Sequence, residues 1–140
     1  MKLLLDTNIF LELILKQQRQ QEVSNLLLKI DEHEFLVSNF SVHSIGLLLC
    51  RKGHYLAFLE FLDDVFIEGG VSIVGLNIKE LKKVIHAVQD ISLDFDDAYQ
   101  YVIAEKYDLT IVSFDTDFDR TERGRKTPAE IIGRTWGGRP

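Results

Sequence analysis

The sequence predicts an α/β fold in which helices cover a parallel sheet. Short apolar runs over residues 2–5, 35–37, 71–74 and 110–112 alternate with longer segments whose apolar side chains recur every three to four positions. This alternation is typical of a parallel sheet, because a crossover helix must return the chain before the next strand can run in the same direction. Aspartates follow the first run directly and the last run shortly after, at the strand ends where open parallel sheets place their chemistry.

The first half of the chain is expected to contain two strands and four helices. In chain order these are a strand over 2–5, helices over 8–16 and 20–31, a strand over 35–37, and helices over 38–51 and 54–67. Asn8 is one candidate cap of the first helix, a capping role for Asp6 is the alternative to a functional one, and Gly53 separates the last two helices. The inward face of the 54–67 helix is expected to carry the apolar residues at helical spacing, namely Leu56, Leu59, Leu62 and Phe66.

The second half is expected to continue the alternation. It contains a strand over 71–74, helices over 78–90 and 93–107, a strand over 110–112, and a short helix or edge strand over 127–132. Asn77 is the expected cap of the 78–90 helix. The buried face of the 93–107 helix is predicted from its spacing to consist of Phe95, Ala98, Tyr99, Val102 and Ile103. This pattern puts Asp94 and Asp97 on the polar side, with Asp94 as the helix cap.

Composition favours one globular domain over residues 1–140. A chain of this length in which 46% of residues are hydrophobic can bury a core of its own. The single Cys50 cannot form an internal disulfide, and no His or Cys cluster has zinc spacing. The apolar runs are too short for a membrane span or a signal peptide. We therefore expect a soluble, cytoplasmic protein without membrane contact.

The charge is unevenly distributed. Residues 1–119 hold 10 Lys or Arg against 20 Asp or Glu, whereas residues 120–140 hold 6 against 2. A basic C-terminal segment therefore begins at about residue 120, although the net charge of the whole chain is −6. The segment is either a solvated tail or a contact for the phosphates of a nucleic acid. The candidates for phosphate contact are Arg120, Arg123, Arg125 and Lys126, with Arg134 and Arg139 further along.

Three acidic positions are the candidates for chemistry. Asp6 and Asp115 would meet at the carboxyl edge of the sheet, and Asp97 on the first turn of its helix can point at the same edge. Converging carboxylates repel each other unless a cation lies between them, and ligands that are all oxygen select Mg²⁺ or Mn²⁺ over zinc. Asp117 is either a further ligand or a local cap. Asp94, Asp96 and Asp119 are expected to be mainly structural.

Neighbouring polar residues have expected supporting roles. Thr7 and Asn8 are placed to orient Asp6 or to cap the helix after it, and Ser113 is placed to hydrogen-bond a neighbouring acid or a water on the metal. An aspartyl-nucleophile phosphatase would commonly need a second acid two residues after Asp6, where this chain has Asn8. We therefore set that reaction class aside.

The segments LLLDTNIFLE, FLVSNFSVHSI and LDFDDAYQYVIAEKYDLTIVSFDTDF together resemble a PIN domain, the ribonuclease domain of VapC-type toxins and other RNA-cleaving proteins. The resemblance implies a three-layer α/β/α sandwich around a parallel sheet of four to five strands. It also implies a pocket that uses Mg²⁺ or Mn²⁺, in which Asp6, Asp97, Asp115 and Asp117 match the acidic positions. The implied partners are an RNA substrate and, for a toxin, an antitoxin protein.

One position departs from the family pattern. PIN domains usually carry a glutamate early in the helix after the second strand, where this chain has Ser44, and no acid lies between Glu34 and Glu60. Two functions therefore stay open: a metal-dependent endoribonuclease, as in a toxin, or a weak or inactive PIN-fold module that binds RNA or protein.

The helices over 38–67 carry more apolar residues than one inward stripe needs. This excess indicates either a thick core or a surface for a homodimer or an antitoxin. It is most evident at the consecutive Leu47, Leu48 and Leu49 and at Phe58, Phe61 and Phe66.

Overall fold

Four parallel strands form the central sheet, in the order β3-β2-β1-β4. The computed structural model describes the backbone of residues 1–135 and the side chains of residues 1–133. The strands are β1 (Lys2–Leu5), β2 (Glu34–Ser38), β3 (Ser72–Val74) and β4 (Thr110–Val112). The predicted α/β class with a parallel sheet is therefore confirmed.

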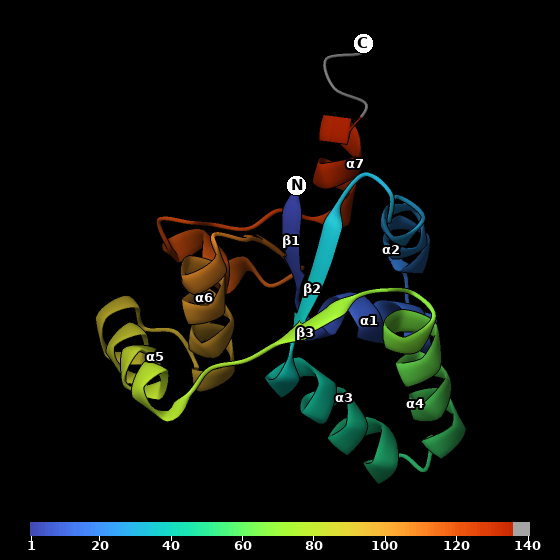
Figure 1. The fold of residues 1–140 in the computed structure, drawn as a ribbon, viewed down its shortest axis with the longest axis horizontal. Helices are drawn as coiled ribbons and strands as arrows, with labels where there is room; N and C mark the ends of the chain where they lie inside the picture. Colours follow the sequence, from blue (N-terminus) through green and yellow to red (C-terminus); the bar gives the residue numbers. More distant parts are fainter. Residues whose placement is uncertain (136–140) are drawn as a thin grey trace.

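Helices cover both faces of this sheet (Figure 1). The helices on one face are α1 (Thr7–Ile14), α2 (Gln20–Leu27), α3 (Asn39–Arg51), α4 (Tyr55–Phe61) and α7 (Pro128–Thr135). The opposite face carries α5 (Ile78–Ile91) and α6 (Phe95–Tyr107). Two short irregular helices complete the order, η1 (Leu62–Ile67) of π type and η2 (Thr116–Arg120) of 3₁₀ type. The arrangement confirms the expected three-layer α/β/α sandwich.

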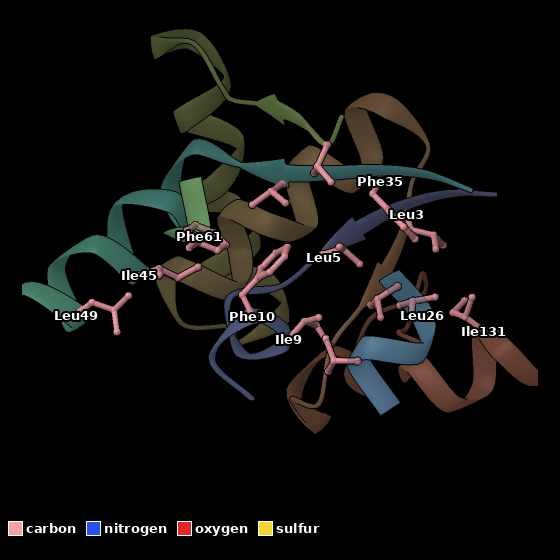
Figure 2. Packing of buried hydrophobic residues seen from close by; sticks show 14 residues of the cluster. Leu3, Leu5, Ile9, Phe10, Leu26, Phe35, Ile45, Leu49, Phe61 and Ile131 are labelled. Carbon is pink, nitrogen blue, oxygen red and sulfur yellow. The ribbon is translucent and has the colours of Figure 1, made fainter. Parts of the chain in front are cut away.

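Alternate residues of each strand supply the two cores. Leu3 and Leu5 point into the same core as Phe10 (Figure 2), whereas Leu4 points to the opposite side and belongs to the core with α6. Successive side chains of a strand point to opposite faces, and both faces of this sheet are covered. This explains why β1 reads as a continuous apolar run.

Several helix boundaries differ from the prediction. Helix α1 begins at Thr7 because, of the two candidate caps, Asp6 is the one used: the Asp6 side chain accepts a hydrogen bond from the Thr7 backbone N–H at 2.8 Å. The helix ends at Ile14, and Lys16 already has a φ of 53°. Helix α2 likewise stops at Leu27, before the predicted 31.

The starts of two helices in the second half of the chain, α7 and α5, have clear sequence signals. The 127–132 segment is part of a helix, α7, which starts with Pro128 at its first position, where a missing N–H costs nothing. Just before it, Lys126 forms a parallel bridge with Val112 at the free side of β4. Asn77 caps α5 as predicted, in a reciprocal capping box with Glu80.

The predicted inward face of the 54–67 helix is wrong in part. Leu56 and Leu59 are exposed, and Phe58 and Phe61 pack inward instead. A Cβ at Gly46 would lie 2.7 Å from the Phe58 ring, so a larger residue at this position would require the ring to shift. The spacing alone could not indicate this, since a continuous apolar helix offers several possible stripes.

The extra apolar residues of the 38–67 helices are partly in the core and partly on the surface. Leu49 and Phe61 belong to the core, which supports the thick-core interpretation for these two. Leu47, Leu56 and Leu59 are 55%, 67% and 57% exposed, so an apolar surface is present as well.

Helix α6 is buried on more sides than its pattern predicted. All residues from Asp97 to Ala104 are buried, whereas Phe95, which was expected inside, is 44% exposed. The helix lies between the sheet and α5, so two of its faces are covered and the N-terminal Phe95 projects beyond them. Among the described residues, no helix combines the length and apolar character that crossing a membrane requires.

Candidate active site

A polar pocket of about 190 Å³ lies at the carboxyl ends of β1 and β4. The chain leaves β1 toward β2 on one side and reaches β4 on the other, so this is the point where the strand order reverses. Open α/β sheets bind ligands at such points. We call this site the acidic pocket, and its polar lining includes Asp6, Ser44, Asp96, Asp97, Gln100 and Asp115.

Asp6 is held on both carboxylate oxygens. Its Oδ1 accepts hydrogen bonds from the Thr7 backbone N–H at 2.8 Å and from Gln100 Nε2 at 3.1 Å. Its Oδ2 accepts one from Ser113 Oγ at 2.7 Å and a longer one from Asn8 Nδ2 at 3.5 Å. The residue is only 7% exposed, and burial raises its pKa although these hydrogen bonds act in the opposite direction. Asp6 is thus both the α1 cap and a wall of the pocket.

Asp97 is a buried acid that lies close to other acids. It lies on the first turn of α6 and is 6% exposed. Burial, together with the negative charges of Asp115, Asp96 and Asp6, raises the pKa of Asp97 to about 8. A cation in the pocket would oppose this shift, since it would offset the repulsion between the acids.

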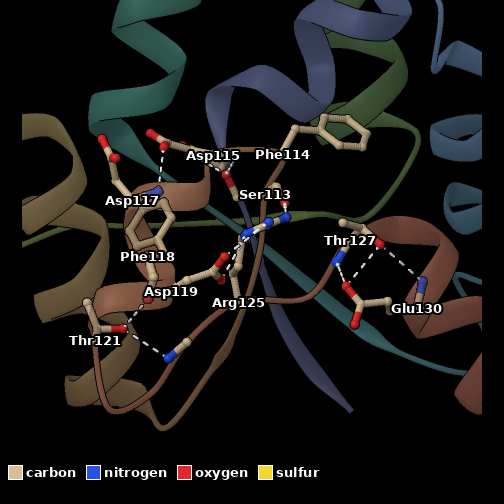
Figure 3. A network of polar contacts seen from close by, with 12 residues as sticks. Ser113, Phe114, Asp115, Asp117, Phe118, Asp119, Thr121, Arg125, Thr127 and Glu130 are labelled. Atoms are coloured by element: carbon tan, nitrogen blue, oxygen red, sulfur yellow. Dashed lines mark hydrogen bonds and ion pairs between the residues drawn. The ribbon is translucent and has the colours of Figure 1, made fainter.

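Asp115 and Asp117 are positioned by the turn after β4 (Figure 3). The backbone N–H of Asp115 donates to Ser113 Oγ at 2.9 Å, and the Asp115 carboxylate accepts from the Asp117 backbone N–H at 2.8 Å. Hydrogen bonds therefore hold both the backbone N–H and the carboxylate of Asp115. The side chain of Asp117 is 45% exposed and forms a 3.5 Å ion pair with Arg120.

Within the described residues, a second arrangement brings Asp94 into the site. Carboxylate oxygens of Asp94, Asp97 and Asp117 all lie within 4.8 Å of one another. Asp94 occupies the N-cap position of α6, but over the described part of the chain its side chain forms no capping hydrogen bond. Asp94 is therefore the N-cap residue by position, as expected, but its side chain lies beside the other acids and makes no capping hydrogen bond to a described residue. Three converging carboxylate oxygens, with no nitrogen or sulfur donor among them, suit Mg²⁺ or Mn²⁺.

Two residues of this region were missed from the sequence. Gln100 is 2% exposed and its Nε2 donates to Ser41 Oγ at 2.6 Å as well as to Asp6. Its Oε1 is buried without a hydrogen-bond partner in the part of the chain that the structure describes. Such an acceptor costs about 1 to 3 kcal/mol. A glutamine between the apolar neighbours Tyr99 and Tyr101 was the available signal, and Ser41 offered none.

A model of the PIN domain matches residues 3–124 of the sequence. The chain belongs to the PIN domain family. No curated protein sequence shows significant similarity to it. Solved structures of the same fold are similar at low identity, and such identities establish the fold alone.

Three of these structures are toxins or toxin–antitoxin complexes. A toxin–antitoxin complex from Klebsiella pneumoniae aligns at 19% identity and a TM-score of 0.67, over 91% of this chain and 98% of that chain. VapC20 of Mycobacterium tuberculosis, described as a sarcin–ricin-loop-cleaving toxin, aligns at 16% and 0.71 over 84% and 92%. VapBC2 from Rickettsia felis, bound to a DNA fragment from its promoter, aligns at 17% and 0.71 over 90% and 97%.

Ser44 lies in the acidic pocket of this PIN domain, on α3. The position expected to hold a glutamate thus faces the other acids but brings no charge. The nearby Thr7 donates from Oγ1 to Ser41 Oγ at 2.8 Å, and Asn8 donates to Ser113 Oγ at 3.2 Å and accepts from the Phe114 backbone N–H at 3.2 Å. Both residues therefore link the start of α1 to its neighbours.

The basic residues after η2 make local contacts. Arg125 pairs with Asp119 and donates to the Ser113 carbonyl at 3.1 Å (Figure 3), so it braces the turn that carries Asp115. Arg123 donates to the Leu109 carbonyl at 2.9 Å, and the backbone of Lys126 pairs with β4. Phosphate contact by Arg120, Arg123, Arg125 and Lys126 stays a prediction. The side chain of Arg134 and the whole of Arg139 lie outside the described residues.

Proposed function

We propose that this PIN domain is an endoribonuclease that hydrolyses RNA phosphodiester bonds with Mg²⁺ or Mn²⁺, and that it is the toxin of a toxin–antitoxin pair. The observation that carries the proposal is the buried Asp97 carboxyl, which shares the pocket with Asp6 and Asp115 at the reversal of strand order. Buried acids with raised pKa values in a cleft are typical of functional sites.

The chain's own residues fit a divalent cation. We propose that Asp97 holds it together with Asp6 and Asp115, which line the same pocket, and that Asp94 and Asp117 add the oxygens that converge on Asp97. A bound Mg²⁺ or Mn²⁺ supplies activation of a water nucleophile and stabilisation of the charge that develops on the phosphate. The half-buried Asp117 is proposed either to complete this ligand set or to orient the attacking water.

The remaining polar residues hold the acids in place. Ser113 connects the two strand ends, because its Oγ donates to Asp6 and accepts from the backbone of Asp115. Arg120 is the basic residue paired with Asp117, and we propose that it turns to an RNA phosphate when substrate arrives. Arg123, Arg125 and Lys126 are the other proposed contacts.

The toxin role is supported by the toxin–antitoxin complexes among the structural neighbours. We propose an antitoxin protein as the partner, and a homodimer as the resting form. The exposed leucines of α3 and α4 are the apolar surface available for these contacts.

The direct test is incubation of the purified protein with structured RNA in Mn²⁺, in Mg²⁺ and in EDTA. Discrete products are expected with either metal and none with EDTA, which also separates this activity from contaminating ribonucleases that need no metal. Intact RNA with both metals, across several structured RNAs, would end the proposal.

The second candidate function, a PIN-fold binding module with little or no activity, is favoured by Ser44. Ser44→Glu is expected to tighten Mn²⁺ binding by about fivefold and to raise cleavage, because metal affinity follows the number of ligand charges. Both effects are measured by Mn²⁺ titration and by the RNA assay. Tighter Mn²⁺ binding in the variant, with no cleavage by either protein, would instead support the binding module.

A further inference from the structure

Gln100 joins three elements beneath the acidic pocket. It lies on α6, one turn after Asp97, and its side-chain amide reaches Asp6 at the end of β1 and Ser41 on α3. The distances from Nε2 are 3.1 Å to Asp6 Oδ1 and 2.6 Å to Ser41 Oγ. One amide nitrogen therefore uses both of its protons in buried hydrogen bonds.

The donors on Asp6 are not equivalent. Thr7 and Asn8 lie at the start of α1, directly after Asp6, and Ser113 directly follows the adjacent strand β4, so these three donors come from the ends of β1 and β4. Gln100 is the donor from α6, the helix that carries Asp97. Its hydrogen bond is therefore the one that sets the Asp6 carboxylate relative to the Asp97 carboxylate.

Ser41 fixes the orientation of the amide. Its Oγ receives hydrogen bonds from Gln100 and from Thr7, and its backbone N–H donates to the Ser38 side chain that caps α3. Turning the Gln100 amide over would aim Oε1 at the Asp6 carboxylate, where two acceptors would face each other. The charge of Asp6 and the anchored Ser41 thus select one orientation.

This orientation of the Gln100 amide costs free energy. It leaves Gln100 Oε1 buried without a partner among the described residues. An apolar side chain of similar length, such as methionine, would fill the position without that loss. The gain that offsets it is the pair of donors directed at Asp6 and Ser41.

We propose that Gln100 is a positioning residue, which holds the Asp6 carboxylate against the helix of Asp97 and so sets the affinity of the pocket for a divalent cation. The inference rests on the proposed function. Gln100 acts through Asp6, and its effect is on metal binding before any effect on RNA.

The test compares Gln100→Met and Gln100→Glu with the wild type, by titrating Mn²⁺ and following free Mn²⁺ by electron paramagnetic resonance. Gln100→Met is expected to weaken Mn²⁺ binding about tenfold, as loss of a group that orients a ligand commonly does. Gln100→Glu is expected to weaken it at least as much, since its carboxylate faces Asp6. The stability of the metal-free Gln100→Met protein, measured by urea unfolding, is expected to equal or exceed that of the wild type.

Thr121→Val is the matched control. Thr121 is buried outside the pocket, and its Oγ1 donates to the Phe118 carbonyl at 2.7 Å (Figure 3), so the variant loses a buried polar contact of another region. It is expected to lower stability and to leave Mn²⁺ affinity unchanged. A parallel loss of affinity in this control would assign the Gln100 effect to general destabilisation and overturn the proposal.

Two other outcomes overturn it as well. Wild-type affinity in Gln100→Met would show that the amide does not position Asp6, and tighter binding in Gln100→Glu would make position 100 a ligand position. Mn²⁺ binding by the wild type without RNA cleavage contradicts the proposed function alone, and the ranking of the variants still decides the role of Gln100. No Mn²⁺ binding by the wild type contradicts both.

Discussion

Asp97→Asn is expected to lower Mn²⁺-dependent RNA cleavage on the order of 10³-fold, the loss that follows removal of one essential electrostatic group. Asp97 is the residue shared by both acid sets, since it faces Asp6 and Asp115 in the pocket and converges with Asp94 and Asp117. Asparagine keeps the shape of the side chain but removes its charge. Initial rates on end-labelled RNA, at saturating Mn²⁺, measure the effect.

Asp90→Asn is the control for this prediction. Asp90 is an exposed carboxylate on α5 and is not among the residues that line the pocket. The substitution makes the same chemical change as Asp97→Asn, from a carboxylate to an amide. Its cleavage rate is expected to equal that of the wild type. Cleavage by Asp97→Asn within a few fold of the control would remove Asp97 from the reaction.

The same Asp97→Asn substitution is expected to stabilise the metal-free protein at pH 8. The pKa of Asp97 is raised from 3.8 to about 8 by burial and by the neighbouring acids. A group with a raised folded-state pKa contributes full stability below its unfolded pKa and loses it as pH rises through the folded value. The loss therefore develops between about pH 4 and pH 8, where the unfolded state releases a proton that the folded state keeps.

The size of this effect follows from the shift. One pKa unit is about 1.4 kcal/mol, and because the pocket opens to solvent we expect only about 3 kcal/mol at pH 8, or about 10 °C in the midpoint of thermal unfolding. Unfolding of both proteins in EDTA at pH 5 and pH 8 measures it. The gap between variant and wild type should widen with pH, with Asp6 retaining part of the slope in both. A gap that is constant or narrows with pH would contradict the raised pKa.

The order of the strands explains why part of the site was predictable. Asp6 and Asp115 each follow an apolar run, and the carboxyl ends of parallel strands share one edge. Because β1 and β4 are neighbours, both acids line one pocket. Asp97 joins them from the first turn of α6, as its place in the sequence predicted.

The direction of the Asp94 side chain could not be predicted from helix-capping rules. Its position before the first turn of α6 is the usual place for a capping aspartate, and the backbone there has the extended conformation of a cap. The direction of the side chain depends on Asp97 and on Asp117 from η2, which is distant in sequence. No pattern within one helix contains that information.

Gln100 was missed for a related reason. A single helical stripe predicts one buried face, whereas α6 is covered by the sheet and by α5. The stripe pattern predicts that a glutamine outside the stripe is exposed, although Gln100 is only 2% exposed in the structure. The prediction of the inward face of α4 was wrong for the same reason, because the packing of Phe58 against Gly46 depends on how α3 and α4 meet.

Calorimetric titration of Mn²⁺ into the metal-free wild type and into Asp97→Asn tests the central claim most directly, because binding is read without any RNA. We expect saturable binding to the wild type and a loss of affinity of about 100-fold or more in the variant. Equal Mn²⁺ affinity of the two proteins, or no binding to the wild type, would contradict the assignment of this pocket as a metal-dependent nuclease site.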